Sequence, residues 1–279
     1  LFDDVQVILG NRGISQWLPL AWTPRAIVDY TFKFNYWLGG FDPLHYHTFN
    51  LIVHICAGMC LLGCVRRILR RPYFGGRYGQ AWGPASVIAL LWVVHPLQTE
   101  SVTYICQRYE SMMGLFYLAS FYFWIRAYEE SSGRFVRGGV SMILLVAGIG
   151  TKEIIVTLPV IMFAYDHVIE EGALRAYFKG RRRYMLFIFS GLFIVTAFPL
   201  INAAVRHLGY RYDSFKLSPL HYLGSQFGVI IHYIRLSLLP HPLCLDYAWP
   251  PASGIQEILL PGLVVGTLFV LTIYGLKKR

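Results

Sequence analysis

The sequence predicts an all-α polytopic membrane protein, and three observations carry this prediction. The mean hydropathy is +0.48. Of the 279 residues, 56% are hydrophobic and 14% are charged, whereas soluble domains carry about 25% charged residues. The apolar residues gather in long runs, which a soluble globule of this size cannot bury. The same composition excludes disordered chains and coiled coils.

Seven runs are predicted to cross the membrane, because a spanning helix needs about 20 mostly apolar residues. Two of them, at 83–98 and 137–151, are short and end in polar motifs. The predicted spans are 46–66, 83–98, 109–127, 137–151, 154–170, 184–204 and 258–276.

The basic residues predict the orientation. One set of loops, including those at 66–77, 126–137 and 175–183, holds 16 of the 25 basic residues and has a net charge of +11. The other set has a net charge of −1. Cytoplasmic loops carry an excess of Lys and Arg, so the first set is predicted to be cytoplasmic and residues 1–43 to form an outer loop. The net charge of +10 is explained by this distribution, and we expect no nucleic-acid partner.

An eighth apolar stretch, 221–239, contains Gln226, His232 and Arg235. If it crossed the membrane, the basic cluster at 277–279 would lie outside. We therefore predict a re-entrant or interfacial helix within a second outer loop, 221–256. A true span, with an orientation error further along the chain, is the alternative.

The predicted outer loops collect charged and imidazole side chains at the ends of spans, where a charge is costly unless it faces a cavity or a partner. Lys152 and Glu153 separate two apolar runs; they are either a polar hairpin turn or part of a site. Arg108 with Glu110 either closes a helix end or binds a lipid phosphate, which an Arg can hold bidentately. The collected residues are Asp3, Asp4, Arg25, His45, His47, His95, Glu100, Arg108, Glu110, Lys152, Glu153, Arg235 and Asp246.

These motifs, taken in order, resemble the relatives of the transmembrane and tetratricopeptide-repeat O-mannosyltransferases, including bacterial membrane proteins with such repeats. The resemblance covers nearly the whole chain, although Gln107 stands where a Gly is usual and the repeats are absent. We therefore expect a fragment of a longer protein, without the first span and the last spans. The matching residues are Phe2-Asp3-Asp4, Arg25, Asn35-Tyr36, Asp42-Pro43, Tyr46-His47, Asn50, His54, His95-Pro96, Thr99-Glu100, Arg108, Glu110, Lys152-Glu153, Gln226, Tyr233, Arg235, Asp246-Tyr247 and Pro250.

The resemblance implies a single transmembrane domain over 1–279 with a GT-C fold, a helical bundle whose outer loops form the active site. It implies an inverting glycosyltransferase in a bacterial inner membrane, with the active face toward the periplasm or exterior. The donor would be a polyprenyl-phosphate sugar, and the acceptors Ser or Thr hydroxyls of exported proteins.

The resemblance also assigns roles. Asp3 would be the base, oriented by Asp4, since attack by a hydroxyl requires its proton to be removed. Arg108, Lys152 and Arg235 are candidates for binding the donor phosphate, whose charge grows in the transition state. Supporting or sugar-binding roles fall to Arg25, His47, His95, Glu100, Glu110, Glu153, Asp246 and Tyr247. A divalent metal on Asp3 and Asp4 lacks a strong ligand set, so we expect no metal or other cofactor.

Two other classes of function remain open. A membrane scaffold or assembly subunit would use the same outer loops to bind an envelope, pilus or respiratory partner, and its Trp and Tyr residues would serve as interface belts. A transporter would need charges inside the spans, whereas here they lie at the ends. An enzyme requires Asp3, Arg108 and Lys152 around one outer site; a scaffold does not.

Overall fold

The computed structural model describes residues 3–11, 13–16, 25–129, 132–170, 219–252 and 254–277. These residues form helices and connections, and no strand occurs among them, in agreement with the predicted all-α class. The chain divides into two compact units, Leu1–Leu192 and Phe193–Arg279. The predicted span at 184–204 and the basic cluster at 175–183 lie outside the described residues.

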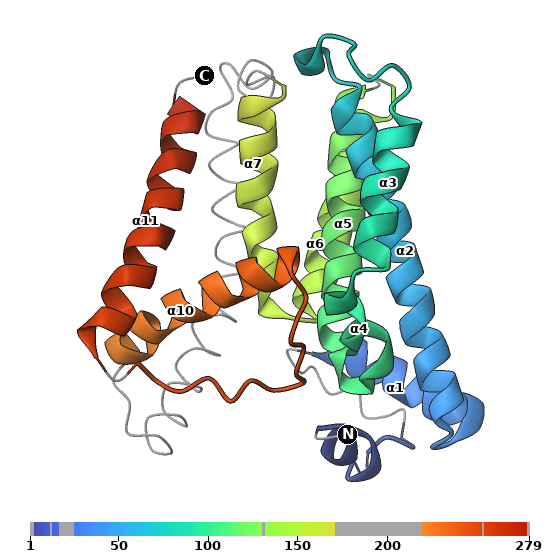
Figure 1. The fold of residues 1–279 in the computed structure, drawn as a ribbon. Coiled ribbons are helices and arrows are strands. Elements are labelled where there is room, and N and C mark those ends of the chain that lie inside the picture. Colours follow the sequence, from blue (N-terminus) through green and yellow to red (C-terminus); the bar gives the residue numbers. More distant parts are fainter. Residues whose placement is uncertain are drawn as a thin grey trace. The chain divides into compact units, whose positions relative to one another are not determined.

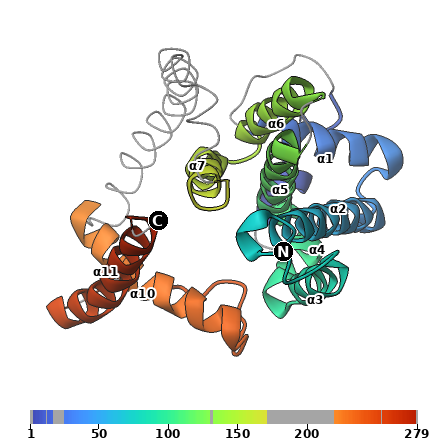
Figure 2. The same cartoon turned by 90° about the horizontal axis from the view of Figure 1, so that it is seen from above.

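The first unit is a bundle in which α5 lies between α2 and α6 (Figures 1 and 2). Its long helices alternate in direction. The described elements are a π-helix at Val5–Leu9, α1 (Ala26–Gly39), α2 (Pro43–Leu69), α3 (Trp82–Val93), α4 (Glu100–Thr103), α5 (Arg108–Glu129), α6 (Arg134–Ile149) and α7 (Leu158–Val168), with 3-10 turns at Pro72–Phe74, Pro96–Gln98, Ile105–Gln107 and Glu153–Thr157.

The two ends of this bundle carry different residues. One end, here called the α1 end, holds the N-terminal segment, α1, α4, the start of α5 and the α6–α7 turn (Figure 1). The opposite end, called the arginine end, holds the α2–α3 and α5–α6 connections. The predicted outer residues of this unit therefore share one end and its described basic loops share the other. Which end faces the cytoplasm stays a prediction.

Prolines fix several helix boundaries. Asp42 caps α2 by accepting a hydrogen bond from the Leu44 N–H at 2.9 Å, and Pro43 occupies the first turn, where no N–H is needed. α3 ends at Val93, because His95 takes the extended conformation that precedes Pro96. α7 begins only at Leu158, after a 3-10 turn. Two of the predicted spans, 83–98 and 154–170, thus form shorter helices than expected.

Two of the described helices, α2 and α11, are long and apolar enough to cross a membrane; α3 is apolar but shorter. The wider seven-span arrangement stays a prediction.

Gly148 sets the packing of the α6–α7 turn, since an added Cβ would lie 1.9 Å from Ile155 Cδ1 and 3.1 Å from the Cβ of Phe116.

The described part of the second unit consists of α10 (Pro219–Leu238), the following loop, and α11 (Ile255–Lys277). α10 runs across α11 rather than alongside it (Figure 1). The helices approach closely at Gly224, where an added Cβ would meet Ile258 at 2.9 Å. If α11 crosses the membrane, a helix so oriented lies along its surface. The predicted helix is confirmed, and its interfacial placement stays a prediction.

Candidate functional site

The segment from Tyr104 to Glu110, which joins α4 to α5, organises the candidate site. The Asp4 carboxylate accepts a hydrogen bond from the Cys106 backbone N–H at 2.8 Å, and the Asp3 N–H donates to the Tyr104 hydroxyl at 3.2 Å. Ile8 packs in the same core as Val28, Phe32 and residues of α2 and α5. The Asp4 carboxylate and the backbone of Asp3 are thereby fixed against the segment 104–110.

The two adjacent carboxylates have different environments. Asp4 is 9% exposed and held by the backbone, whereas Asp3 is exposed and its carboxylate has no hydrogen-bond partner within the described part of the chain. Burial raises the pKa of the Cys106 thiol and of the Tyr104 hydroxyl, and the neighbouring aspartates reinforce the effect on Cys106. Both groups therefore stay protonated, and Asp3 is the carboxylate that a second molecule can reach.

Lys152 binds to the same segment from the α6–α7 turn. Its ammonium forms an ion pair with Glu110, in the first turn of α5. Burial lowers the pKa of Lys152, the nearby Arg25 lowers it further, and Glu153 opposes both. The turn is tied to α1 by a backbone hydrogen bond from the Ile27 N–H to the Gly150 carbonyl at 3.2 Å.

Arg25 is positioned by the aromatic ring of Tyr109, which is itself held by the carboxylate of Asp29. Its guanidinium lies 5.1 Å from the centroid of the Tyr109 ring. The Tyr109 hydroxyl donates to the Asp29 carboxylate at 2.7 Å, which fixes the ring. Asp3, Asp4, Lys152, Glu110 and Arg25 are thus all attached to the segment 104–110 or to its immediate neighbours.

Arg108 has a role that the sequence did not predict. It is fully buried, and its guanidinium donates to the Asn50 side chain at 2.7 Å, the Asn35 side chain at 2.5 Å and the Tyr46 carbonyl at 3.0 Å. It also donates to the Thr31 hydroxyl at 3.1 Å. With its donors directed at α1 and α2, Arg108 has no surface left for a lipid phosphate. The geometry favours a structural role over the predicted phosphate contact.

The histidines and the remaining glutamates lie at the same end. His47 Nδ1 is 3.1 Å from the Val102 carbonyl, and His95 Nδ1 accepts from the Leu97 N–H at 3.2 Å. In each imidazole, Nδ1 therefore contacts a backbone group. Glu100 is half-buried at the start of α4, and burial raises the pKa of its carboxyl; Glu153 follows Lys152 in the turn.

The second unit holds the other three predicted residues. Arg235 is exposed and donates to the His241 carbonyl at 3.2 Å. The Asp246 carboxylate accepts from the Ala248 N–H at 2.8 Å, and the Tyr247 hydroxyl donates to the Pro242 carbonyl at 2.9 Å. These contacts shape the loop after α10, and the part of these residues in the site stays a prediction.

Several contributors were not predicted as site residues. Tyr104, Tyr109 and Asp29 position groups of the site, and Asn35 and Asn50 hold Arg108. Asn35 and Asn50 were among the residues that carry the family resemblance, and Asn50 lies inside the predicted span 46–66. Tyr109 and Asp29 carried no comparable signal. Over the described ranges, no three His, Cys, Asp or Glu residues come together as a metal ion would require; the expectation of a metal-free site stays a prediction.

Comparison with known proteins gives a consistent set of relatives. No protein-family model matches the chain, and no solved structure does. The human protein O-mannosyl-transferase TMTC3 is 28% identical over 193 residues, covering 62% of this chain and 20% of that protein. The Drosophila melanogaster protein O-mannosyl-transferase Tmtc3 is 30% identical over 161 residues, covering 47% and 17%. The Caenorhabditis elegans protein O-mannosyl-transferase F38B6.6 is 25% identical over 263 residues, covering 91% and 34%. The chain spans about a fifth of the length of the human relative.

Proposed function

We propose that this chain, a relative of proteins named protein O-mannosyl-transferase, is the catalytic membrane part of an inverting glycosyltransferase. It moves a sugar from a polyprenyl-phosphate donor to Ser or Thr hydroxyls of exported proteins, at the outer face of a bacterial inner membrane. One observation supports this best: the Asp4 carboxylate and the Lys152–Glu110 pair are attached to the same segment, 104–110. The residues proposed as base and as phosphate-binding cation thus lie at one end of the bundle.

In the proposed step, the acceptor oxygen attacks the anomeric carbon and the carbon–oxygen bond to the phosphate breaks. Asp3 takes the hydroxyl proton, because its carboxylate is exposed. Asp4, held by the Cys106 N–H, fixes the backbone that carries Asp3. The electron pair of the broken bond leaves on the polyprenyl phosphate, and the anomeric configuration is inverted.

Lys152 and Arg25 are the cations proposed to receive the leaving phosphate. Lys152 is half-buried, so its charge is screened less than that of an exposed lysine. The incoming phosphate replaces Glu110 as the partner of the ammonium. A preorganised cation at a developing charge contributes about 3–4 kcal/mol to lowering the barrier. Arg235 remains a candidate from the second unit.

The test is transfer of mannose from polyprenyl-phosphate mannose to a Ser/Thr peptide. Asp3→Asn keeps the size of the side chain but removes the base, so the turnover rate should fall by roughly 10²–10⁴-fold. Donor binding should be retained, because the cations are untouched. Lys152→Gln should instead weaken donor binding. Unchanged turnover in Asp3→Asn removes Asp3 from the mechanism.

If the chain is instead a scaffold, no sugar transfer is expected. A partner-binding subunit has no need for Asp3 and Lys152 to be attached to one segment, and it shows no transfer with any lipid-linked sugar. Wild-type protein that is folded, binds no polyprenyl phosphate and transfers no sugar would therefore favour the scaffold.

A further inference from the structure

We propose that the α2–α3 connection at the arginine end, residues 66–82, is a binding site for the head groups of anionic phospholipids. The site lies at the end of the bundle opposite to the candidate active site (Figure 1). It does not depend on the proposed transfer reaction.

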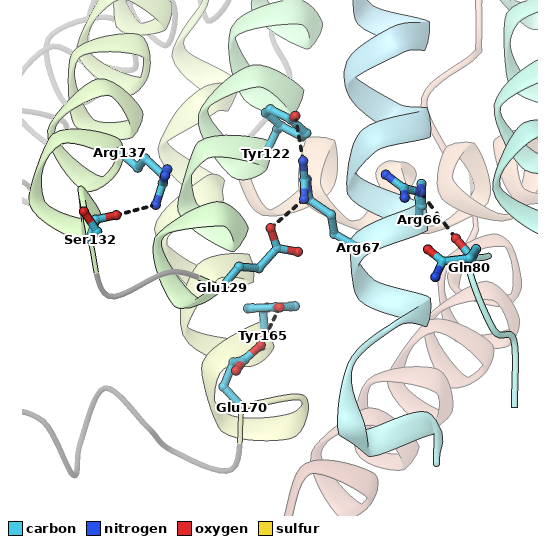
Figure 3. A network of polar contacts seen from close by, with 9 residues as sticks. All are labelled: Arg66, Arg67, Gln80, Tyr122, Glu129, Ser132, Arg137, Tyr165 and Glu170. Atoms are coloured by element: carbon cyan, nitrogen blue, oxygen red, sulfur yellow. Dashed lines mark hydrogen bonds and ion pairs between the residues drawn. The ribbon is translucent and has the colours of Figure 1, made fainter. Parts of the chain in front are cut away.

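The arginines of this connection form two sets. Arg67 and Arg71 are neutralised inside the bundle: Arg67 pairs with Glu129 at 2.5 Å and donates to the Tyr122 hydroxyl at 3.1 Å, and Arg71 pairs with Glu170. Arg66, Arg70 and Arg77 have no carboxylate partner anywhere in the described ranges. Figure 3 shows Arg67 directed at Glu129 and Tyr122, and Arg66 turned away from both.

The helical repeat explains the different directions of Arg66 and Arg67. Successive residues of an α-helix are about 100° apart, so these two side chains lie on different faces of α2. Arg70 is the C-cap of α2, and Arg71 follows it in an extended conformation. The Arg66 guanidinium lies 3.9 Å from the centroid of the Trp82 ring, and its Nε–H donates to the Gln80 carbonyl at 3.3 Å. Its terminal nitrogens have no hydrogen-bond partner among the described residues. Arg66 is therefore held in place, and its two terminal nitrogens can still donate to a phosphate together.

The loop that carries Arg77 has a defined conformation. Gly75, Gly76 and Gly79 have φ values of 58°, 73° and 51°, which side chains of other residues rarely allow. Tyr73, Phe74 and Tyr78 pack edge to face, with ring centroids 4.9 and 5.8 Å apart. Arg77 is thus presented on a folded loop, and it is exposed.

Charge and position determine the partner. No Asp or Glu occurs in 66–82, and Arg66, Arg70 and Arg77 pair with no carboxylate of the described residues, so these three arginines form a positive surface. The connection directly follows α2, which is long enough to cross a membrane, and Trp82 is 54% exposed beside Arg66, as is typical of side chains at the lipid head groups. Juxtamembrane basic clusters attract anionic lipids, and an Arg fork matches a phosphate oxygen pair. A soluble anion would not need the membrane-level Trp.

The experiment measures binding of phosphatidylglycerol and of phosphatidylcholine to the purified full chain in neutral detergent, by native mass spectrometry. Phosphatidylglycerol should bind more tightly. The double variant Arg70→Gln/Arg77→Gln, which leaves the Arg66–Trp82 contact intact, should lose at least about tenfold in affinity for phosphatidylglycerol and nothing for phosphatidylcholine. Arg77→Gln alone should lose about fivefold, the effect expected of one arginine near a lipid surface.

Lys33→Gln is the matched control, since it removes a cation from the α1 end. Its affinity for phosphatidylglycerol should equal that of the wild type. The proposal is overturned if Lys33→Gln loses as much affinity as Arg77→Gln, or if the double variant binds phosphatidylglycerol normally. Displacement of the lipid by an equal concentration of soluble glycerol phosphate would show a free phosphate site and would also overturn it.

Discussion

At position 108, a buried guanidinium satisfies the side chains of Asn35 and Asn50, both of which are themselves buried. Removing it leaves those amides unpaired, and each hydrogen bond to a charged group contributes about 1.5–3 kcal/mol. Arg108→Gln should therefore lower the free energy of unfolding by roughly 3 kcal/mol, and the melting temperature in detergent should fall accordingly. Arg77→Gln should melt like the wild type, because the Arg77 side chain is exposed and makes no hydrogen bond or ion pair among the described residues. If Arg108→Gln melts normally but loses donor binding, Arg108 is a phosphate ligand after all.

The titration of Lys152 gives a second expectation at this scale. Burial and Arg25 hold the pKa of its ammonium below the ordinary 10.5. The cation is present below this pKa and is lost as the pH rises through it, so transfer should decline on the alkaline side below pH 10.5. In Lys152→Arg, whose guanidinium stays charged, this alkaline decline should move to higher pH. The pH profiles of donor binding for both proteins provide the measurement; identical profiles would mean that another group causes the decline.

The sequence predicted which charged residues of the first unit gather at one end, because charges at span ends are costly and therefore informative. It did not predict which of them are buried within the bundle and which remain accessible. Lys152 and Arg108 look alike in a list of cations, but one is half-buried and the other fully buried. Burial depends on packing by α1, and the position of α1 against α2 and α5 could not be inferred from its own residues.

At the scale of elements, the positions of helices were predictable and their boundaries less so. Apolar runs predicted α2, α5 and α11, whereas 154–170 was predicted as one span and the chain forms a 3-10 turn before α7. The Ile155 side chain explains this turn, since it is fully buried against Leu145 and Met162 and adjoins the close approach at Gly148. From the sequence alone, an apolar residue buried in a turn cannot be distinguished from an apolar residue of a membrane span.

Gly148 provides the test at this scale. An added methyl would press on Ile155 and on the Cβ of Phe116, and overpacking of this kind costs roughly 1–3 kcal/mol. Gly148→Ala should lower the melting temperature and, by shifting the turn that carries Lys152, weaken donor binding.

Gly139→Ala is the control on the same helix, because an added Cβ there meets nothing within 4 Å. It should be neutral or more stable by about 0.5–1 kcal/mol, since alanine favours a helix over glycine. Equal effects of the two substitutions would show that the packing at Gly148 does not fix the turn.

For the whole molecule, the segregation of charge between bundle ends predicts which surfaces share a side of the membrane. In a background without native cysteines, Leu38→Cys at the α1 end should react with an impermeant maleimide on intact cells. Arg77→Cys at the arginine end should react only after permeabilisation. The opposite pattern would reverse the orientation and exclude an outer active site.

The same labelling decides the placement of α10. Tyr222 and Leu239 lie near its two ends and are 45% and 68% exposed. If α10 is interfacial, cysteines at both positions should be labelled from the same side. Labelling from opposite sides would make 221–239 a true span.

Asp4 accepts a hydrogen bond from the main-chain amide of Cys106, and the thiol of the same residue contacts its carboxylate as well. Every amino acid except proline supplies the amide donor, so the main-chain part of this contact survives a change of residue 106. A survey of natural or laboratory variants should find position 106 permissive to most replacements that fit its buried space. Tolerance of substitutions at position 106 would then reflect the use of a backbone donor, and it would not mean that the residue lies outside the site.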